Sequence, residues 1–334
     1  MGPVSSRRNI GRTLTPVLAL AAAFLAAMGS ATECLAQTKL PRVGIAGVSS
    51  ASSVWIPTFE RVLADRGLAP GKNIVLDYRY LQGGLSGLDE SVRDLVSLNA
   101  SVIFATSAPA LRAAYAATHS IPIVAWNMSD DPVAAGYAES YARPGKTVTG
   151  VFLDAPELAG KWLEILKALV PGLSRVAVLW DPSPGTVHRR GVELAAKSIG
   201  VQLQIHELRT EADIERISKA LPGRPQAMVI LPSPLFYTHS ARLAELALKQ
   251  RLPATSIFRA FSEAGGAVSY GPENTEGAQR AAAMVAKILE GTKPGDIPIE
   301  RPTKFEFLLN MKTIKALGLT VPGSLLLGAE QVNR

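Results

Sequence analysis

Cysteine is almost absent from this sequence of 334 residues, and only 6% of its residues are aromatic. The single cysteine, Cys34, lies in an N-terminal segment that we expect to be removed, so the mature chain would have no disulfide and no thiol chemistry. The histidines are few and far apart, and none has the His-x-x-x-His spacing of a helical zinc site; they are His119, His188, His206 and His239. We therefore expect no metal ion and no cofactor, and a fold that core burial alone stabilises.

Signatures of common enzymes and of nucleic-acid-binding proteins are missing too. No Gly-x-Ser-x-Gly motif or phosphate-binding Walker loop follows the first apolar run, and Gly44–Gly47 lacks the rest of a dinucleotide-binding motif. The net charge of +7 is spread along the chain without a dense run of lysine and arginine, which argues against a nucleic acid as partner. The sequence therefore favours a protein that binds without catalysis.

The first 36 residues have the three parts of a secretory signal peptide. A basic start with Arg7, Arg8 and Arg12 precedes an uncharged apolar run, Leu14–Met28, and small residues then lead to Ala36. This run of about 15 residues is shorter than the roughly 20 that a membrane-spanning helix needs. We therefore expect cleavage near Ala36 rather than a membrane anchor.

Two features of this segment concern the export route and the processing of the chain. Ser6–Ile10 resembles a twin-arginine signal only in part, so the Sec route is favoured. Ala31–Glu33, before Cys34, does not match the motif that directs lipid attachment. We expect a periplasmic protein that is not an integral membrane protein once processed.

From Arg42 onward, short apolar runs alternate with amphipathic segments. Runs that are apolar throughout are typical of strands buried on both faces; they lie at Arg42–Val48, Ile74–Leu81, Ser101–Thr106, Ile121–Asn127, Thr147–Phe152, Arg175–Trp180, Val201–Leu208, Ala227–Leu231 and Ala254–Phe258. Helical patterns lie at Trp55–Arg66, Leu88–Leu98, Ala108–Thr118, Glu157–Leu169, Val187–Ile199, Glu211–Leu221, Thr238–Arg251 and Thr275–Leu289. Such alternation, interrupted near residue 152 and then resumed, predicts an α/β protein with two Rossmann-like lobes, each built on a parallel sheet.

Polar residues follow many of the predicted strands, at the edge where open parallel sheets bind ligands. The candidate ligand-binding residues are Ser49, Ser50, Ser52, Thr106, Ser107, Ser129, Asp130, Asp181, Ser183, Ser233 and Phe236, with Tyr270 near the end of the second series. Hydroxyls and helix starts suit a ligand carboxylate, and an aspartate suits an ammonium group. Structural explanations remain open: the serines as a turn, Asp131 as a helix cap before Pro132, Asp181 as a turn residue and Phe236 as part of the core.

Several stretches, in order along nearly the whole mature chain, carry a resemblance to a known family. They are Gly71–Arg79, Asp131–Gly136, Ala142–Val151, Glu263–Gly266, Ser269–Pro272, Pro302–Phe307 and Lys315–Pro322. On these stretches the chain resembles the ABC transporter substrate-binding proteins, the family that includes tryptophan/tyrosine-type binding proteins.

The resemblance implies a type I periplasmic-binding-protein fold with a hinge of three chain crossings. It would place residues 40–152 plus 272–300 in lobe 1 and residues 153–271 plus 303–334 in lobe 2, after a signal peptide at 1–36. It also implies a small-molecule ligand (an amino acid, aromatic acid or other small carboxylate) and the permease subunits of an ABC importer as partners. The family often has Asp-Pro-Leu-Phe where this chain has Ser233-Pro234-Leu235-Phe236, so a carboxylate that could meet a ligand cation is missing there.

Two other functional classes differ from this one in what they would require of the sequence. An exported sensor for a membrane signalling kinase has the same fold and is the alternative that the sequence leaves open. A repressor with a related core would need an N-terminal helix-turn-helix, and the signal peptide occupies that place.

Overall fold

The computed structural model describes residues 1–2, 39–48, 53–80, 85, 87–219 and 221–332. The chain divides into two units, Met1–Leu40 and Pro41–Arg334. Almost all of the expected signal peptide lies outside the described residues. Within the described residues, no helix has the length and apolar character needed to cross a membrane.

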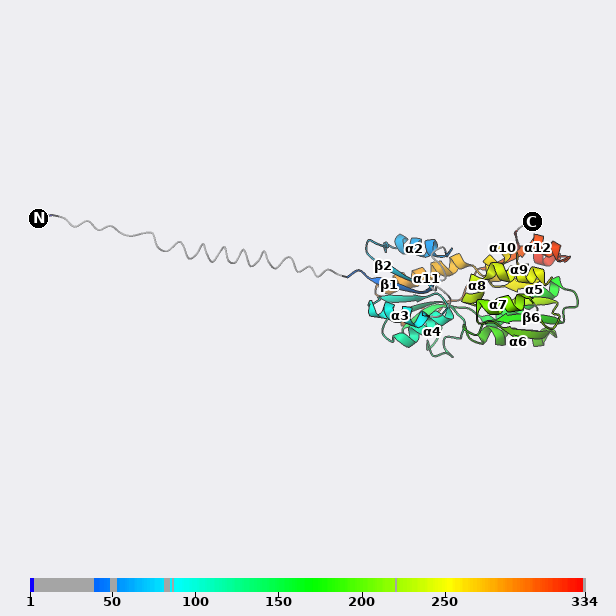
Figure 1. Cartoon of the computed structure of the whole chain (residues 1–334). Helices are drawn as coiled ribbons and strands as arrows, with labels where there is room; N and C mark the ends of the chain where they lie inside the picture. The colour runs from blue at the N-terminus through cyan, green and yellow to red at the C-terminus, as the bar shows by residue number, and fades with distance from the viewer. Residues whose placement is uncertain (3–38, 49–52, 81–84, 86, 220, 333–334) are drawn as a thin grey trace. The chain divides into compact units, whose positions relative to one another are not determined.

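A five-stranded parallel sheet with strand order β2-β1-β3-β4-β5 forms the core of the first lobe. Its strands are β1 (Arg42–Val48), β2 (Val75–Tyr80), β3 (Val102–Ala105), β4 (Ile123–Met128) and β5 (Val148–Phe152). Helices α2 (Ile56–Asp65) and α11 (Asn274–Leu289) pack on one face, and helices α3 (Leu88–Ser97) and α4 (Ala108–Ala117) pack on the other (Figure 1). The two faces are alternate sides of the same strands: Val43 and Ile45 contact the first pair of helices, and Ala46 contacts the second.

A seven-stranded sheet with strand order β12-β11-β10-β9-β8-β6-β7 forms the second lobe. Its strands are β6 (Arg175–Trp180), β7 (Gln202–Glu207), β8 (Ala227–Ile230), β9 (Ala254–Ser256), β10 (Val268–Pro272), β11 (Phe305–Asn310) and β12 (Glu330–Val332). The pairing is parallel except between β10 and β11. The predicted α/β class with two lobes of mostly parallel sheet is confirmed.

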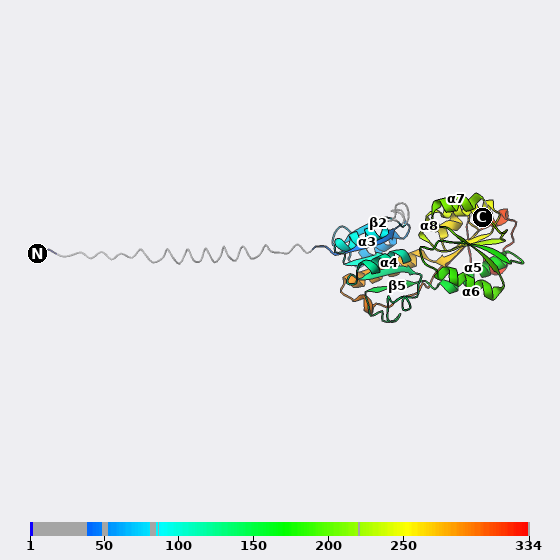
Figure 2. The ribbon, with the colours of Figure 1, turned by 60° about the horizontal axis from the view of Figure 1, so that its bottom comes forward.

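Helices cover both faces of the second sheet as well. Helices α5 (Ala155–Leu169) and α6 (Val187–Ile199) share one hydrophobic cluster, and α7 (Glu211–Lys219) and α9 (Ser240–Lys249) share the other. In Figure 2 the strands form a fan between α7 and the pair α5 and α6. The shorter helices are α8 (Pro234–Thr238), α10 (Arg259–Glu263), η1 (Pro294–Asp296), α12 (Met311–Ala316) and α13 (Gly323–Leu326).

Two local predictions differ from the structure. The pattern predicted a helix over Thr238–Arg251, which corresponds to α9, but it did not predict the short helix α8, which His239 separates from α9. The helix expected at Asp131 is a series of turns, in which Asp131 Oδ1 accepts hydrogen bonds from the amides of Val133 and Ala134 at 2.8 and 3.0 Å. Asp131 therefore caps a turn that does not continue as a helix.

Helix α11 contacts the first sheet, although the strands on either side of it in the chain, β10 and β11, belong to the second sheet. Its Ala278, Ala281 and Val285 lie in the cluster that contains Val43 and Val124 of the first sheet. The chain thus passes between the sheets after β5, before α11 and again before β11. The exact limits that we predict for each lobe stay a prediction.

The carboxylate of Glu276, near the start of α11, links two of these connections: the one that leads into α11 and the one that leads into β11. It accepts hydrogen bonds from the amides of Thr303 and Lys304 at 3.0 and 2.8 Å, from the Thr303 hydroxyl, and from Arg280 at 2.8 Å. Burial raises the pKa of Glu276, but the hydrogen bonds from Thr303, Arg280 and Lys304 outweigh burial and lower the pKa to about 2. The charged form of Glu276 therefore holds α11 against the segment that leads into β11.

We expect Glu276→Gln to lower the free energy of unfolding by about 3 kcal/mol near neutral pH, which corresponds to the lowering of the Glu276 pKa from 4.5 to about 2. In the native protein this contribution is complete above pH 4.5. It is lost as the pH falls towards 2, because the unfolded chain binds the proton first. Urea unfolding at several pH values measures both effects. Glu245→Gln, an exposed change on α9, is the control, and equal stability of the two variants would contradict the assignment.

Candidate functional site

A cavity lies where the carboxyl ends of strands from both sheets come together. Residues from the ends of β1, β3 and β4 line it from the first lobe, and residues that follow β6, β8 and β9 line it from the second. Its empty volume is about 870 Å³, including space that opens to solvent. A cavity in this position, at the carboxyl ends of parallel strands, is typical of a small-molecule site.

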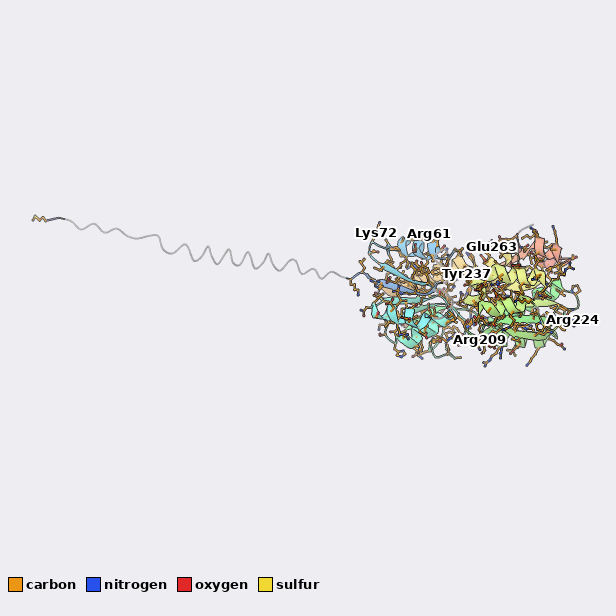
Figure 3. All side chains as sticks on the ribbon, in the orientation of Figure 1. Arg61, Lys72, Arg209, Arg224, Tyr237 and Glu263 are labelled. Carbon is orange, nitrogen blue, oxygen red and sulfur yellow. The ribbon has the colours of Figure 1, made fainter. Side chains whose placement is uncertain are left out.

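Aromatic rings from both lobes form much of the cavity wall. Trp55 and Trp126 come from the first lobe and meet edge to face at 5.5 Å between ring centroids. Tyr237 and Phe258 come from the second lobe and meet edge to face at 5.1 Å; Tyr237 is labelled in Figure 3. Rings held in this way present flat apolar surfaces to a ligand without losing much conformational freedom on binding.

The Trp126 ring depends on packing from behind the cavity. It is almost fully buried and stacks on Phe104 with ring centroids 6.2 Å apart and an interplanar angle of 16°. Gly277 of α11 lies directly against it, because a Cβ atom at position 277 would overlap the indole nitrogen of Trp126. Helix α11 therefore supports the cavity wall as well as the connection between the lobes.

Hydroxyl groups at helix starts supply the polar part of the wall. Ser107 is the N-cap of α4 and accepts a hydrogen bond from the Ala110 amide at 3.4 Å, and the Thr106 hydroxyl donates to the carbonyl of Ala46 at 3.1 Å. On the other side, Ser233 is the N-cap of α8 and accepts from the Phe236 amide at 3.0 Å. These bonds fix the hydroxyl oxygens at the cavity surface.

Asn127 lines the cavity in a backbone conformation that few residue types adopt. Its φ angle is +59°, in the left-handed region, and the pairing of β4 with β5 shifts register between Ala125 and Met128. Its buried Oδ1 atom has no hydrogen-bond partner among the described residues. Irregular strand ends of this kind change the direction of side chains and are frequent beside binding sites.

The two lobes contact one another beside the cavity. His188 Nε2 lies 3.1 Å from Ser129 Oγ, and burial lowers the pKa of His188 to about 4, so the imidazole is neutral at physiological pH. Arg112 of α4 donates hydrogen bonds to the carbonyl oxygens of Ser183 and Pro184, the latter at 3.2 Å. A carboxylate oxygen of Asp130 lies 3.6 Å from the Arg112 guanidinium.

The family comparison settles what kind of protein carries this cavity. The sequence profile of a family described as ABC transporter substrate binding protein matches residues 54–333. The chain belongs to this family. It is therefore a solute-binding receptor, in a family of binding proteins rather than enzymes, and the resemblance seen in the sequence is confirmed.

Individual relatives agree with this membership. A tyrosine-binding protein of Clostridioides difficile is 25% identical over 265 residues, which are 78% of this chain and 75% of the relative. A crystal structure of a conserved domain protein from Vibrio cholerae superposes with a TM-score of 0.79 at 23% identity, covering 88% of this chain and 99% of that protein. An ABC domain from Streptococcus pneumoniae in complex with L-Trp has a TM-score of 0.78 at 19% identity and the same coverage. The structural likeness establishes the type I periplasmic-binding-protein fold.

The predicted site residues of this substrate-binding protein lie in several different environments. Thr106, Ser107, Ser129 and Ser233 line the cavity. Ser49, Ser50 and Ser52 lie outside the described residues. The other candidates are not among the described residues of the cavity wall; they are Asp130, Asp181, Ser183, Phe236 and Tyr270.

Each of these five residues has a contact of its own. Asp181 accepts hydrogen bonds from the amide and hydroxyl of Ser183 at 2.9 and 2.7 Å, and Asp130 faces Arg112. Phe236 is fully buried in the core of the second lobe. Tyr270 lines a second cavity, where its ring stacks on Phe305 at 5.7 Å. Since these contacts account for their positions, the ligand roles of the five residues stay predictions.

Sequence reasoning missed several aromatic and polar residues of the cavity wall. They include Trp55, Trp126, Asn127, His188 and Phe258. Most lie at the last positions of an apolar run or in the first turn of the helix that follows a strand. A search that included those positions, rather than the intervening loops alone, would have found them.

We expect Arg112→Ala to weaken binding of every ligand about tenfold, because the bonds from Arg112 to the second lobe form only when the lobes are together. Selectivity between ligands should not change, since Arg112 does not line the cavity. Stopped-flow dissociation rates measure the effect, with Arg93→Ala, an exposed change on α3, as control. A change in selectivity, or a dissociation rate equal to that of the control, would rule out a role in closure.

Proposed function

We propose that this substrate-binding protein holds a small organic solute with an aromatic ring between its lobes and delivers it to the permease subunits of an ABC importer. The observation that carries the proposal is the set of four aromatic side chains, two from each lobe, around one cavity. Relatives described as tyrosine-binding, or solved with L-Trp, support an aromatic ligand.

Binding energies explain why both lobes are needed. Burial of one aromatic ring gives roughly 1.5–3 kcal/mol, and each hydrogen bond to a charged ligand group gives about 1.5–3 kcal/mol. Micromolar affinity needs about 8 kcal/mol after the costs of ordering and desolvation are subtracted. Contacts from one lobe hardly reach that value, so a ligand that contacts both lobes favours the closed arrangement.

The location of the protein follows from the N-terminal segment and the family. We infer that the chain is exported through the Sec route, loses its signal peptide near Ala36 and works in the periplasm. The basic start and apolar run of the first 36 residues support export. An importer of this class receives its solute on the outer side of the membrane, which agrees with that location.

We expect Tyr237→Ala to weaken ligand binding about 10- to 100-fold, because the lost ring contributes roughly 1.5–3 kcal/mol and each 1.4 kcal/mol is a factor of ten. Calorimetry against aromatic acids and aromatic amino acids measures the loss. Tyr80→Ala is the matched control, since Tyr80 is exposed on the edge strand β2 and does not line the cavity. Unchanged affinity in Tyr237→Ala would exclude this cavity as the ligand site.

We expect the mature protein from the periplasmic fraction to begin at Gln37. Intact-mass measurement and N-terminal sequencing determine this directly. A chain that keeps Met1 and remains in the cytoplasm would contradict the proposed location, and a lipid on Cys34 would contradict the proposed processing.

A further inference from the structure

The described part of the cavity wall carries no ionised side chain. Among the described residues that line it, none is aspartate, glutamate, lysine or arginine, and its single titratable imidazole, His188, is kept neutral by burial. The remaining residues of the body, 49–52, 81–84, 86, 220 and 333–334, include no aspartate or glutamate in the sequence. The described wall therefore offers a ligand neutral polar groups and aromatic surfaces, and no carboxylate.

Four acidic residues are close to wall residues in the chain, and none lines the described wall. Both oxygens of Asp181 accept hydrogen bonds from Ser183, Asp130 faces the Arg112 guanidinium, and Asp154 lies 3.2 Å from the Arg301 guanidinium. Glu273 precedes Asn274, which lines the cavity, but Glu273 itself does not line it. None of the four provides a carboxylate at the described wall.

A positively charged ligand group would be poorly accommodated in such a site. An ammonium group that leaves water loses strong hydration, and a hydroxyl or amide oxygen replaces only part of it. A nearby carboxylate normally compensates for this loss, and its attraction is strongest where water is excluded. A cavity with aromatic walls and no carboxylate therefore disfavours any solute that carries an amino group.

We propose that this site selects aromatic solutes that lack a charged amino group, such as aryl-substituted carboxylic acids, and rejects zwitterionic aromatic amino acids. The inference rests on the proposed function, since it names the class of solute that the receptor takes. It separates this chain from the relatives that are described by a tyrosine or tryptophan ligand.

The test compares compounds that differ only in the amino group. L-tyrosine is paired with 3-(4-hydroxyphenyl)propanoate and L-tryptophan with 3-(indol-3-yl)propanoate, with tyramine as an amine that has no carboxylate. We expect calorimetry on the mature protein to show at least tenfold tighter binding of the propanoate in one pair, and no binding of tyramine. Equal or tighter binding of the amino acids in both pairs would overturn the inference while leaving the proposed function intact.

A variant of Ser233 tests the cause of the selectivity. Ser233 lines the cavity, is 4% exposed and caps α8. Aspartate and asparagine are both good N-cap residues, so Ser233→Asp adds a carboxylate to the wall, while Ser233→Asn adds a neutral side chain of the same size. We expect Ser233→Asp to shift the preference towards the amino acid at least tenfold, and Ser233→Asn to leave it unchanged.

Three further results would count against the proposals in different ways. An unchanged preference in a folded Ser233→Asp variant, shown by an intact melting transition, would mean that the missing carboxylate is not the cause. An equal shift in Ser233→Asn would assign the effect to size rather than charge. If none of the compounds binds at millimolar concentration, the proposal of an aromatic solute is wrong, and the inference about its charge is wrong as well.

Discussion

The carboxylate of Glu276 is the group on which the relation between the two sheets depends. A buried carboxylate needs hydrogen-bond donors, and here the donors are the backbone of residues 303–304 and the side chains of Thr303 and Arg280. Because α11 packs on the first sheet and residues 303–304 lead into the second, these bonds join the two halves at the connection itself. The cavity lies between the same two halves, so its walls are placed relative to each other partly through this group.

Charge is arranged very differently at the edge of the cavity and at its surface. Arg112 and Asp130 are partly exposed where the lobes meet, so water screens their interaction and the bonds can break and form again. The cavity surface consists instead of aromatic rings, hydroxyls that cap helices, and a neutral His188. In the proposed function, the edge residues would influence how firmly the lobes stay together, and the wall residues would determine which solute fits.

The apolar runs predicted all five strands of the first sheet and β6, β7, β8 and β9 of the second, but not β10, β11 and β12. The predicted strands are recognisable because a strand that is covered by helices on both faces has few positions where a polar residue is favourable. The direction of β11 could not be predicted in the same way. Its own residues, Phe305–Asn310, allow either direction, and its antiparallel pairing with β10 follows from the return of the chain from the first lobe. Topology of this kind depends on where distant segments lie and leaves no local pattern.

The cavity was predicted only in part, for a related reason. The hydroxyls of Thr106, Ser107, Ser129 and Ser233 were found because they follow strands. Trp126 and Asn127 were assigned to a strand as its last two residues, and the sequence does not show the register shift between Ala125 and Met128. Likewise, a residue in the first turn of a helix, such as His188 or Tyr237, has the same pattern whether it faces a core or a ligand. Asp181 is the opposite case. It was predicted as a ligand residue because it lies in a loop after a strand, but its carboxylate accepts hydrogen bonds from the nearby Ser183.

Neighbouring residues of α11 contact two different parts of the protein. Glu276 holds the chain connection, and Gly277 lies against the back of the Trp126 ring. A change in the tilt of this helix would therefore alter the depth of the cavity at the same time as it loosens the connection. New solute sizes could in this way arise through substitutions that never contact the solute, and such changes would alter the opening motion together with the specificity.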